Sequence, residues 1–208
     1  MSLFEFDQVF FKKDIKFIAG ADEVGRGPLA GPVVASMVIL PENKRLAGLD
    51  DSKKLTEKKR ERLYALICAE ALALAVSFVG EDKVDDLNIL NATKLAMKTC
   101  LSDIKITPDL LLIDGNFLID TDIKQKSIVK GDAKSAVIAA ASIVAKVERD
   151  RFMKKIHLKY PEYGFDSHKG YASKKHLEAI QKYGPCKLHR KSFRPITDFF
   201  NRQMEFGL

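Results

Sequence analysis

The sequence predicts an α/β fold, in which helices flank a mixed β-sheet and a small helical part follows at the C-terminus. Strand-like segments come first as a closely spaced pair and then alternate with helical segments. This order favours a sheet with both antiparallel and parallel neighbours. The chain has 208 residues, 46% of them hydrophobic, which suits one domain with a sizeable core. We expect residues 1–160 to form this core, and residues 161–208 to form a basic helical extension packed on it.

Five segments have the pattern of β-strands. A short glycine- and proline-containing segment separates the first two, so we expect them to pair antiparallel. The fourth is a run of leucine and isoleucine that suits a buried central strand. The predicted strands are residues 15–21, 31–40, 75–79, 110–113 and 127–129.

Apolar residues recur at helical spacing in the segments between these strands. Thr56 follows a polar loop at residues 50–54 and is a suitable N-cap for the first long helix. A second helix is expected from about residue 86 to 101, a long one from about 133 to 157, and a last one near 173–183.

The net charge is +7, and the excess is concentrated in one segment. Residues 154–194 hold eleven lysines and arginines and only three acids. A one-sided basic surface indicates a polyanionic partner, with nucleic acid as the first candidate. The alternative is a solvated helix face that only keeps the protein in solution.

Other features exclude several classes of protein. There is no run of about 18 uncharged apolar residues, so no membrane span is expected. The N-terminus lacks the basic and apolar regions of a signal peptide. Cys68, Cys100 and Cys186 are far apart and form no Cys-x-x-Cys pair, which argues against a zinc site or a disulfide framework. We expect a cytoplasmic protein, monomeric by default.

Two adjacent acids, Asp22 and Glu23, come at the end of the first predicted strand and lead into a glycine-rich segment. Successive side chains of a strand point to opposite faces, so both acids can face one point only if the strand ends or twists there. Gly25 and Gly27 allow a ligand to approach the main chain. The alternative interpretation is a strand that runs into a charged turn.

Two further acids share this context. Asp114 closes the central strand, and Asp132 follows Gly131 where a helix is expected to begin. Ligands of open α/β sheets gather beyond the strand ends, so these acids could converge with Asp22 and Glu23. Taken singly, Asp114 could be a turn former and Asp132 a helix N-cap.

Carboxylates gathered in this way are costly unless cations neutralise them. Oxygen ligands without Cys or His favour Mg²⁺ or Mn²⁺. Two such ions about 3.5–4 Å apart can promote in-line displacement at phosphorus. We therefore prefer a metal site of Asp22, Glu23, Asp114 and Asp132 as the interpretation of these acids.

The chain resembles the bacterial ribonuclease HII family from about residue 16 to 195. The first motif is fairly specific by itself, and the ordered set of motifs is very specific. The matching segments are residues 22–33 (DEVGRGPLAGPV), 51–55 (DSKKL), 87–90 (LNIL), 113–116 (IDGN), 130–132 (KGD), 139–146 (AAASIVAK), 149–150 (RD), 160–161 (YP), 163–165 (YGF), 168–171 (HKGY) and 189–193 (HRKSF).

This resemblance implies a ribonuclease H-like fold and an endonuclease that cuts the RNA strand of RNA–DNA hybrids, including a single ribonucleotide within duplex DNA. Asp22, Glu23, Asp114 and Asp132 match the family's four acidic positions. The resemblance also implies Mn²⁺ or Mg²⁺ as cofactor, and products with 5′-phosphate and 3′-hydroxyl ends.

Recognition of one ribonucleotide requires contact with its 2′-hydroxyl. The resemblance assigns this contact to the backbone of Gly25, Arg26 and Gly27, and assigns Tyr171 to the adjacent deoxyribose. An ordinary half-buried tyrosine is the alternative for Tyr171.

Three basic residues are candidates for phosphate contacts, which position a duplex without reading its sequence. They are Lys53, Lys169 and Arg190. We assign no catalytic role to His168 and His189, because a lone histidine in a basic segment is more often structural.

Residues 196–200 have a faint likeness to a sliding-clamp-binding peptide, but Phe193 holds the position of the expected glutamine. Aromatic residues that close a domain core explain this segment better. Two rival functions are a ribonuclease HIII, whose members usually carry an extra N-terminal domain, and a non-catalytic hybrid-binding protein. The four acids argue against a pure binder, because uncompensated carboxylates repel phosphate.

Overall fold

The computed structural model describes residues 1–50, 52 and 55–205, and the side chains of these residues up to Asn201. Lys53, one of the residues predicted to contact phosphate, lies outside the described residues. So do Asp51 and Lys54 of the predicted polar loop.

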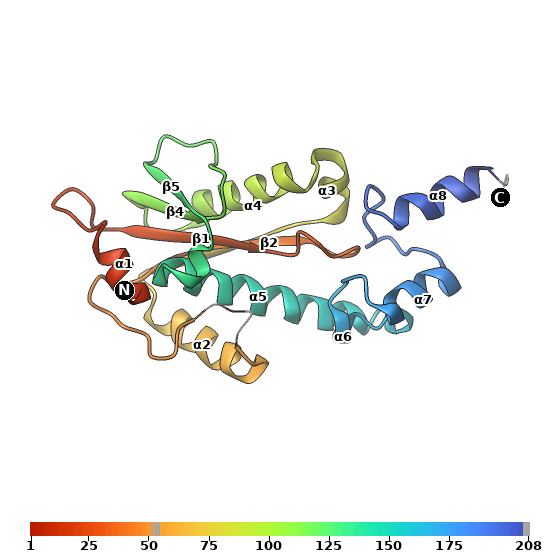
Figure 1. Cartoon of the computed structure of the whole chain (residues 1–208), viewed down its shortest axis with the longest axis horizontal. Coiled ribbons are helices and arrows are strands. Elements are labelled where there is room, and N and C mark those ends of the chain that lie inside the picture. Colours follow the sequence, from red (N-terminus) through yellow and green to blue (C-terminus); the bar gives the residue numbers. More distant parts are fainter. Residues whose placement is uncertain (51, 53–54, 206–208) are drawn as a thin grey trace.

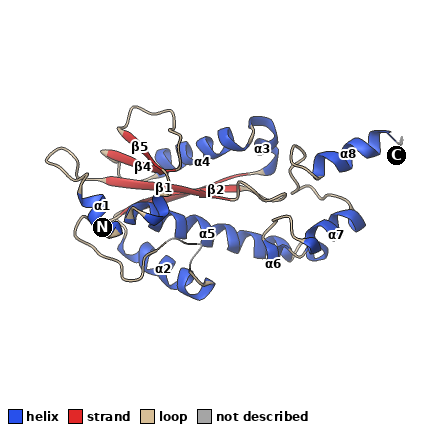
Figure 2. Ribbon diagram, in the orientation of Figure 1, coloured by secondary structure: helices blue, strands red, loops and turns tan. Residues whose placement is uncertain are grey.

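A five-stranded mixed sheet forms the centre of the protein (Figure 2). Its strand order is β3-β2-β1-β4-β5. β1 and β2 pair antiparallel, as their short connection predicts, and β3 pairs antiparallel with β2 after a longer connection that contains a helix. In contrast, β4 lies parallel to β1 and β5 parallel to β4. The predicted mixed sheet is therefore confirmed. The strands are β1 (Ile18–Val24), β2 (Val33–Ile39), β3 (Ala73–Val79), β4 (Leu110–Asp114) and β5 (Gln125–Ile128).

Helices cover both faces of this sheet and make it the middle of three layers (Figure 1). On one face α3 and α4 bury apolar side chains against β1, β2, β3 and β4. On the other face α1, α2 and α5 do the same. The bounds of these helices are α1 (Leu3–Gln8), α2 (Glu57–Glu70), α3 (Glu81–Leu87), α4 (Ile89–Asp103) and α5 (Ala136–His157).

The long helix α5 lies very close to β1, and Gly20 permits this approach. A Cβ atom at Gly20 would lie 2.2 Å from the carbonyl carbon of Val137 on α5. The neighbouring strand is fixed to the same helix, because the Ser36 hydroxyl of β2 donates to the carbonyl oxygen of Ala141 at 2.6 Å. The alanine-rich sequence of α5 thus serves close packing on the centre of the sheet.

Two helix boundaries differ from the sequence prediction. The helix expected from about residue 86 is interrupted at Asn88, which has a φ of 65° and whose side chain caps the first turn of α4. The long helix begins at Ala136 instead of about 133, because Ser135 is its N-cap. A 3-10 turn, η1 (Gly131–Ala133), precedes it. The predicted cap at Thr56 is confirmed, since its hydroxyl accepts a hydrogen bond from the amide of Lys59.

Short helices beyond residue 160 gather at the far end of α5 (Figure 1). Their apolar side chains pack with Leu29, Ala30 and Met153 of the preceding chain around the buried ring of Phe165. Asp85 of α3 also holds this part, because its carboxylate accepts hydrogen bonds from the amides of residues 191 and 192. The elements are η2 (Pro161–Tyr163), α6 (Phe165–His168), α7 (Lys174–Tyr183) and α8 (Ile196–Glu205).

None of the helices in the described ranges is long and apolar enough to cross a membrane. Cys68, Cys100 and Cys186 are all free thiols.

Candidate active site

The central strands bring two of the predicted acids to the same end of the sheet. Strands β1 and β4 are parallel neighbours, with Ala21 opposite Ile113, so Asp22 and Asp114 follow at the next position of each strand. Side chains alternate between the two faces of a strand. Ala21 packs on the α4 side and the Cβ position of Gly20 faces α5, which directs Asp22 toward α5 and Glu23 toward the α4 side.

The carboxylate of Asp22 is buried beneath α5. Its Oδ1 accepts a hydrogen bond from the amide of Glu23 at 2.7 Å, and the Ser142 hydroxyl of α5 lies close enough to lower the pKa of the same carboxylate. Burial raises the pKa of Asp22 well above its ordinary value, and the negative charges of Glu23 and Asp114 raise this pKa further. Such repulsion is typical of carboxylates that share a site.

Glu23 lies at the same strand end, although β1 does not stop between the two acids and continues to Val24. Its Oε1 accepts from the Arg26 guanidinium at 3.3 Å. Its Oε2 is buried and has no hydrogen-bond partner among the described residues. Burial raises the pKa of Glu23, against the lowering effect of Arg26, and the charge of Asp114 adds to the rise.

The turn after β5 brings Asp132 to this end of the sheet. The amide of Gly131 donates to Oδ1 of Asp114 at 2.6 Å, and Asp132 follows in the buried turn η1. Lys130 takes a left-handed conformation, with φ of 56°, to direct the chain into this turn. Asp132 is therefore not the N-cap of α5. Asp114 binds the neighbouring loop through its side chain.

In the described part of the chain, no group of three or more His, Cys, Asp or Glu side chains is arranged to hold a metal ion. The chemistry of the predicted acids nevertheless fits a divalent cation. Asp22, Glu23 and Asp114 repel one another, and the buried Oε2 of Glu23 lacks a donor. A cation would relieve both costs, and these hard oxygen atoms are the ligands that Mg²⁺ and Mn²⁺ prefer.

The glycine-rich segment forms a loop directly beside the acids. Gly25 is buried and has a φ of 93°, a conformation that other residues resist. Arg26 and Gly27 are exposed. Among the described residues, a Cβ atom at Gly27 would meet only the ring of Tyr171, at 3.8 Å, and Tyr171 is itself 43% exposed. The exposed residues Arg26 and Gly27 and an exposed aromatic ring thus lie together close to Glu23.

Arg190 occupies a position that excludes the predicted phosphate contact. Its side chain is completely buried, and its guanidinium donates to the carbonyl oxygens of Gly25, Arg26 and Gly31. The prediction of a direct contact is wrong for this reason. A basic residue in a basic segment was assumed to face solvent, and this one folds inward to bind the loop.

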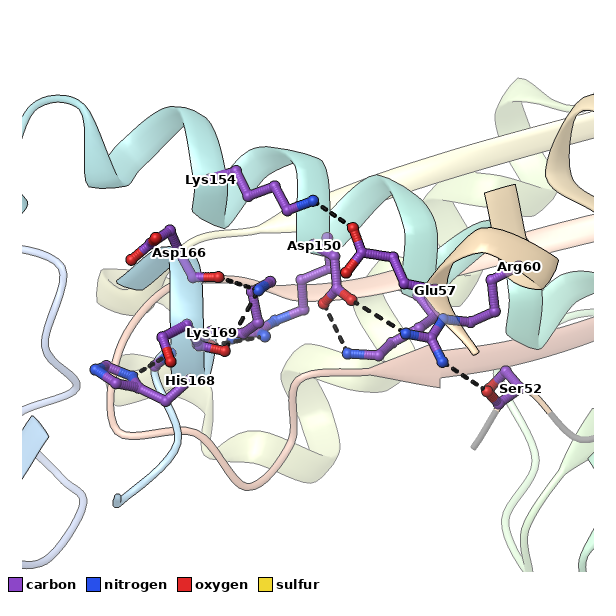
Figure 3. Close-up of polar contacts among 12 residues, drawn as sticks. Ser52, Glu57, Arg60, Asp150, Lys154, Asp166, His168 and Lys169 are labelled. Carbon is purple, nitrogen blue, oxygen red and sulfur yellow. Dashed lines mark hydrogen bonds and ion pairs between the residues drawn. The ribbon is translucent and has the colours of Figure 1, made fainter. Parts of the chain in front are cut away.

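Lys169 lies in a polar network between α5, α6 and the start of α2 (Figure 3). Its ammonium donates to the carbonyl oxygens of Asp166 and Ser167 on its own turn. Nearby, Asp150 of α5 accepts from Lys146 at 2.7 Å. The phosphate contact of Lys169 stays a prediction.

The two histidines left out of catalysis pack inside the C-terminal part. His168 stacks on His176 with ring centroids 4.4 Å apart, and Nε2 of His176 lies 3.1 Å from Nε2 of His189. Burial lowers the pKa of both His176 and His189 to about 4, so these rings are neutral at neutral pH.

Sequence reasoning missed the roles of two residues on α5. The Ser142 hydroxyl lowers the pKa of Asp22 and lies 2.8 Å from the Ser52 hydroxyl, so it lies between the first acid and the loop before α2. Arg149 is fully buried and donates to three backbone carbonyls. A polar side chain on an otherwise apolar helix face was the available signal for both.

Solved structures share this architecture. Ribonuclease H2 from Pyrococcus horikoshii OT3 has a TM-score of 0.78 at 26% identity, over 91% of this chain and 99% of that one. A structure of the PCNA:RNase HII complex from Archaeoglobus fulgidus matches with a TM-score of 0.72 at 27% identity, over 86% of this chain and 95% of that one. The fold is that of the ribonucleases H, hydrolases that cut the RNA of RNA–DNA hybrids.

The chain belongs to the ribonuclease HII family. The family model described as Ribonuclease HII matches residues 19–196. A ribonuclease HII from Acetivibrio thermocellus is 54% identical over 188 residues, which span 90% of this chain and 73% of that protein. The predicted family is thus confirmed, against both the ribonuclease HIII and the non-catalytic alternative.

Proposed function

We propose that this ribonuclease H nicks duplex DNA on the 5′ side of a single embedded ribonucleotide, and also cleaves continuous RNA–DNA hybrids. The observation that carries the proposal is that the glycine-rich loop directly follows Asp22 and Glu23 in the chain. Asp22 and Glu23 lie near the end of β1, which ends at Val24, and the exposed residues Arg26 and Gly27 begin three residues after Glu23. A group that could read a 2′-hydroxyl therefore lies beside the groups that would promote cleavage.

Asp22, Glu23, Asp114 and Asp132 would hold two Mn²⁺ or Mg²⁺ ions. Bound there, the ions supply activation of the attacking water and stabilisation of the leaving oxygen, which leaves 5′-phosphate and 3′-hydroxyl ends. The protein contributes rigid positions for the acids. The amide of Glu23 fixes the carboxylate of Asp22, and the amide of Gly131 fixes that of Asp114.

Recognition of the substrate would involve both the loop and the basic C-terminal part, residues 161–208. The main chain of Gly25, Arg26 and Gly27 would bind the ribose 2′-hydroxyl, and Tyr171 would pack on the sugar that follows. Lys53 and Lys169 would contact phosphates, which makes binding sensitive to salt. None of these contacts reads base sequence.

A nicking assay tests the proposal. The substrates are a DNA duplex with one ribonucleotide and an uninterrupted RNA–DNA hybrid, each with Mn²⁺, Mg²⁺ or EDTA. We expect a metal-dependent nick on the 5′ side of the lone ribonucleotide. Cleavage of the long hybrid alone would contradict ribonucleotide recognition, and cleavage in EDTA would contradict the metal site.

A contact with a sliding clamp through residues 196–200 stays a prediction. The Archaeoglobus fulgidus ribonuclease HII structure contains PCNA. In this chain Ile196 is completely buried and Phe200 packs against the C-terminal apolar cluster. These side chains already close a core, so the segment would have to detach from it before it could bind a clamp.

A further inference from the structure

Two buried arginines bind the glycine-rich loop, residues 25–32, from the interior of the protein. Arg149 of α5 and Arg190 are both completely buried, and neither forms an ion pair with an acid among the described residues. Burial lowers the pKa of each to about 10, so both keep their charge at neutral pH. Burying two cations without carboxylates is costly. Their partners are backbone carbonyls instead.

Arg190 binds the first half of the loop. Its Nη2 donates to the carbonyl oxygen of Gly25 at 2.6 Å, and its Nη1 donates to that of Arg26 at 3.1 Å. The C=O and N–H of a trans peptide point in opposite directions. Since both carbonyls point inward to Arg190, the next amides, those of Arg26 and Gly27, point outward. Two consecutive N–H donors are thereby presented at the exposed part of the loop.

Arg149 binds the second half of the loop and joins it to Tyr171. Its Nη2 and Nε donate to the carbonyl oxygens of Ala30 and Pro32, at 3.2 and 3.0 Å. Its Nη1 donates to the carbonyl oxygen of Lys169 at 2.9 Å, two residues before Tyr171. The loop and the aromatic ring are therefore fixed to the same guanidinium.

Gly25 leaves space for the side chain of Arg149. A Cβ atom at Gly25 would lie 2.4 Å from Nε of Arg149, whereas one at Gly31 would lie 2.6 Å from Sδ of Met153. Gly31 also offers its carbonyl oxygen to Arg190, at 3.0 Å from Nε and 2.7 Å from Nη2. Gly25 is thus required both by its positive φ and by contact with the buried guanidinium.

We propose that Arg149 and Arg190 are positioning residues for ribose specificity: Arg190 orients the amides of Arg26 and Gly27 toward the ribose 2′-hydroxyl, and Arg149 fixes the distance from this loop to Tyr171. The inference rests on the proposed function, in which the loop reads the ribose. Lysine cannot replace either residue, because one ammonium cannot bind several carbonyls in the fixed geometry of a guanidinium.

The test compares the full-length protein with Arg190→Lys and Arg149→Lys, two variants that conserve charge. The matched control is Arg194→Lys, whose side chain is 87% exposed. Each protein is titrated in Ca²⁺ buffer with a DNA duplex that contains one ribonucleotide and with the same duplex in all-DNA form. The ratio of the two dissociation constants measures ribose discrimination. Circular dichroism and Mn²⁺ titration of the protein alone report folding and the acid site.

We expect Arg190→Lys to lower the discrimination ratio by roughly tenfold, the worth of about one well-aimed hydrogen bond, while Mn²⁺ affinity stays unchanged. Arg149→Lys should also reduce the ratio, and Arg194→Lys should leave it as in the wild type. A merely structural role would weaken binding to both duplexes equally and leave the ratio unchanged, which would overturn the inference. If the wild-type protein bound both duplexes with the same dissociation constant, the proposed function would be overturned instead.

Hydrogen exchange of the wild-type protein provides a test that does not depend on folding of a variant. The amides of Arg26 and Gly27 should exchange quickly in the free protein and become protected by the ribonucleotide-containing duplex, but not by the all-DNA duplex. Slow exchange of these amides in the free protein would show that they do not point outward, and would contradict the inference.

Discussion

Replacement of Gly20 by alanine is expected to damage both stability and cleavage. The added Cβ atom would lie 2.2 Å from the carbonyl carbon and 2.3 Å from the oxygen of Val137, and 2.4 Å from the amide nitrogen of Ile138. All three are backbone atoms, so no side-chain rotation relieves the clash. To reach ordinary contact, α5 and β1 must separate by roughly 1 Å, and overpacking of this kind costs about 1–3 kcal/mol.

The same separation would also change the active site, because Asp22 follows two residues later and its buried carboxylate lies next to Ser142 of α5. A displacement of about 1 Å at reacting groups can lower the rate by about a hundredfold. Urea unfolding gives the change in stability, and single-turnover nicking with saturating Mn²⁺ gives the change in rate.

Gly80→Ala is the matched control, since a Cβ atom there meets no atom of the described part of the chain within 4 Å. Its change in stability should stay below about 1 kcal/mol, with cleavage unaffected. A Gly20→Ala protein that unfolds at the wild-type urea concentration and cleaves at the wild-type rate would refute the close approach of α5 and β1.

Three further substitutions test other parts of the structure. Asp22→Asn should abolish cleavage while binding to a hybrid survives, as measured by gel shift, and substantial turnover would contradict its place in the metal site. Gly27→Val should weaken binding to a ribonucleotide-containing duplex more than it weakens Mn²⁺ binding; equal binding to the duplex would remove this loop from recognition. Asp7→Asn tests a buried carboxyl whose Oδ2 accepts from the amide of Val137 at 3.0 Å and whose pKa burial raises to about 6. Because the pKa of Asp7 is higher in the folded state than in the unfolded state, protonation of this carboxyl stabilises the folded protein. This stabilisation is lost as the pH rises through about 6. The wild type should therefore be less stable than Asp7→Asn at pH 7, by up to about 3 kcal/mol, and nearly equal to it near pH 4. If the free energies of unfolding of the wild type and Asp7→Asn differed by the same amount at both pH values, the pKa of Asp7 would not be raised by folding.

Local signals in the sequence predicted most of the elements. β-branched residues and a run of leucine and isoleucine indicated strands, and Thr56 marked the start of α2. The interruption at Asn88 was missed, because a left-handed residue that caps the next helix is compatible with a continuous apolar pattern. The start of α5 was placed too early for a similar reason, since Asp132 and Ser135 are both good caps and only the 3-10 turn selects Ser135.

The sequence by itself determined the family, the mixed sheet and the identity of the acids expected to hold metal, because each depends on residue types in a fixed order. Only the tertiary structure decided which way the side chains face. Arg190 has the same local sequence signal as a surface arginine, yet its guanidinium lies inside and binds carbonyls more than 150 residues away in the chain. Burial of that kind is set by contacts between distant segments. A local pattern of charge carries no information about it.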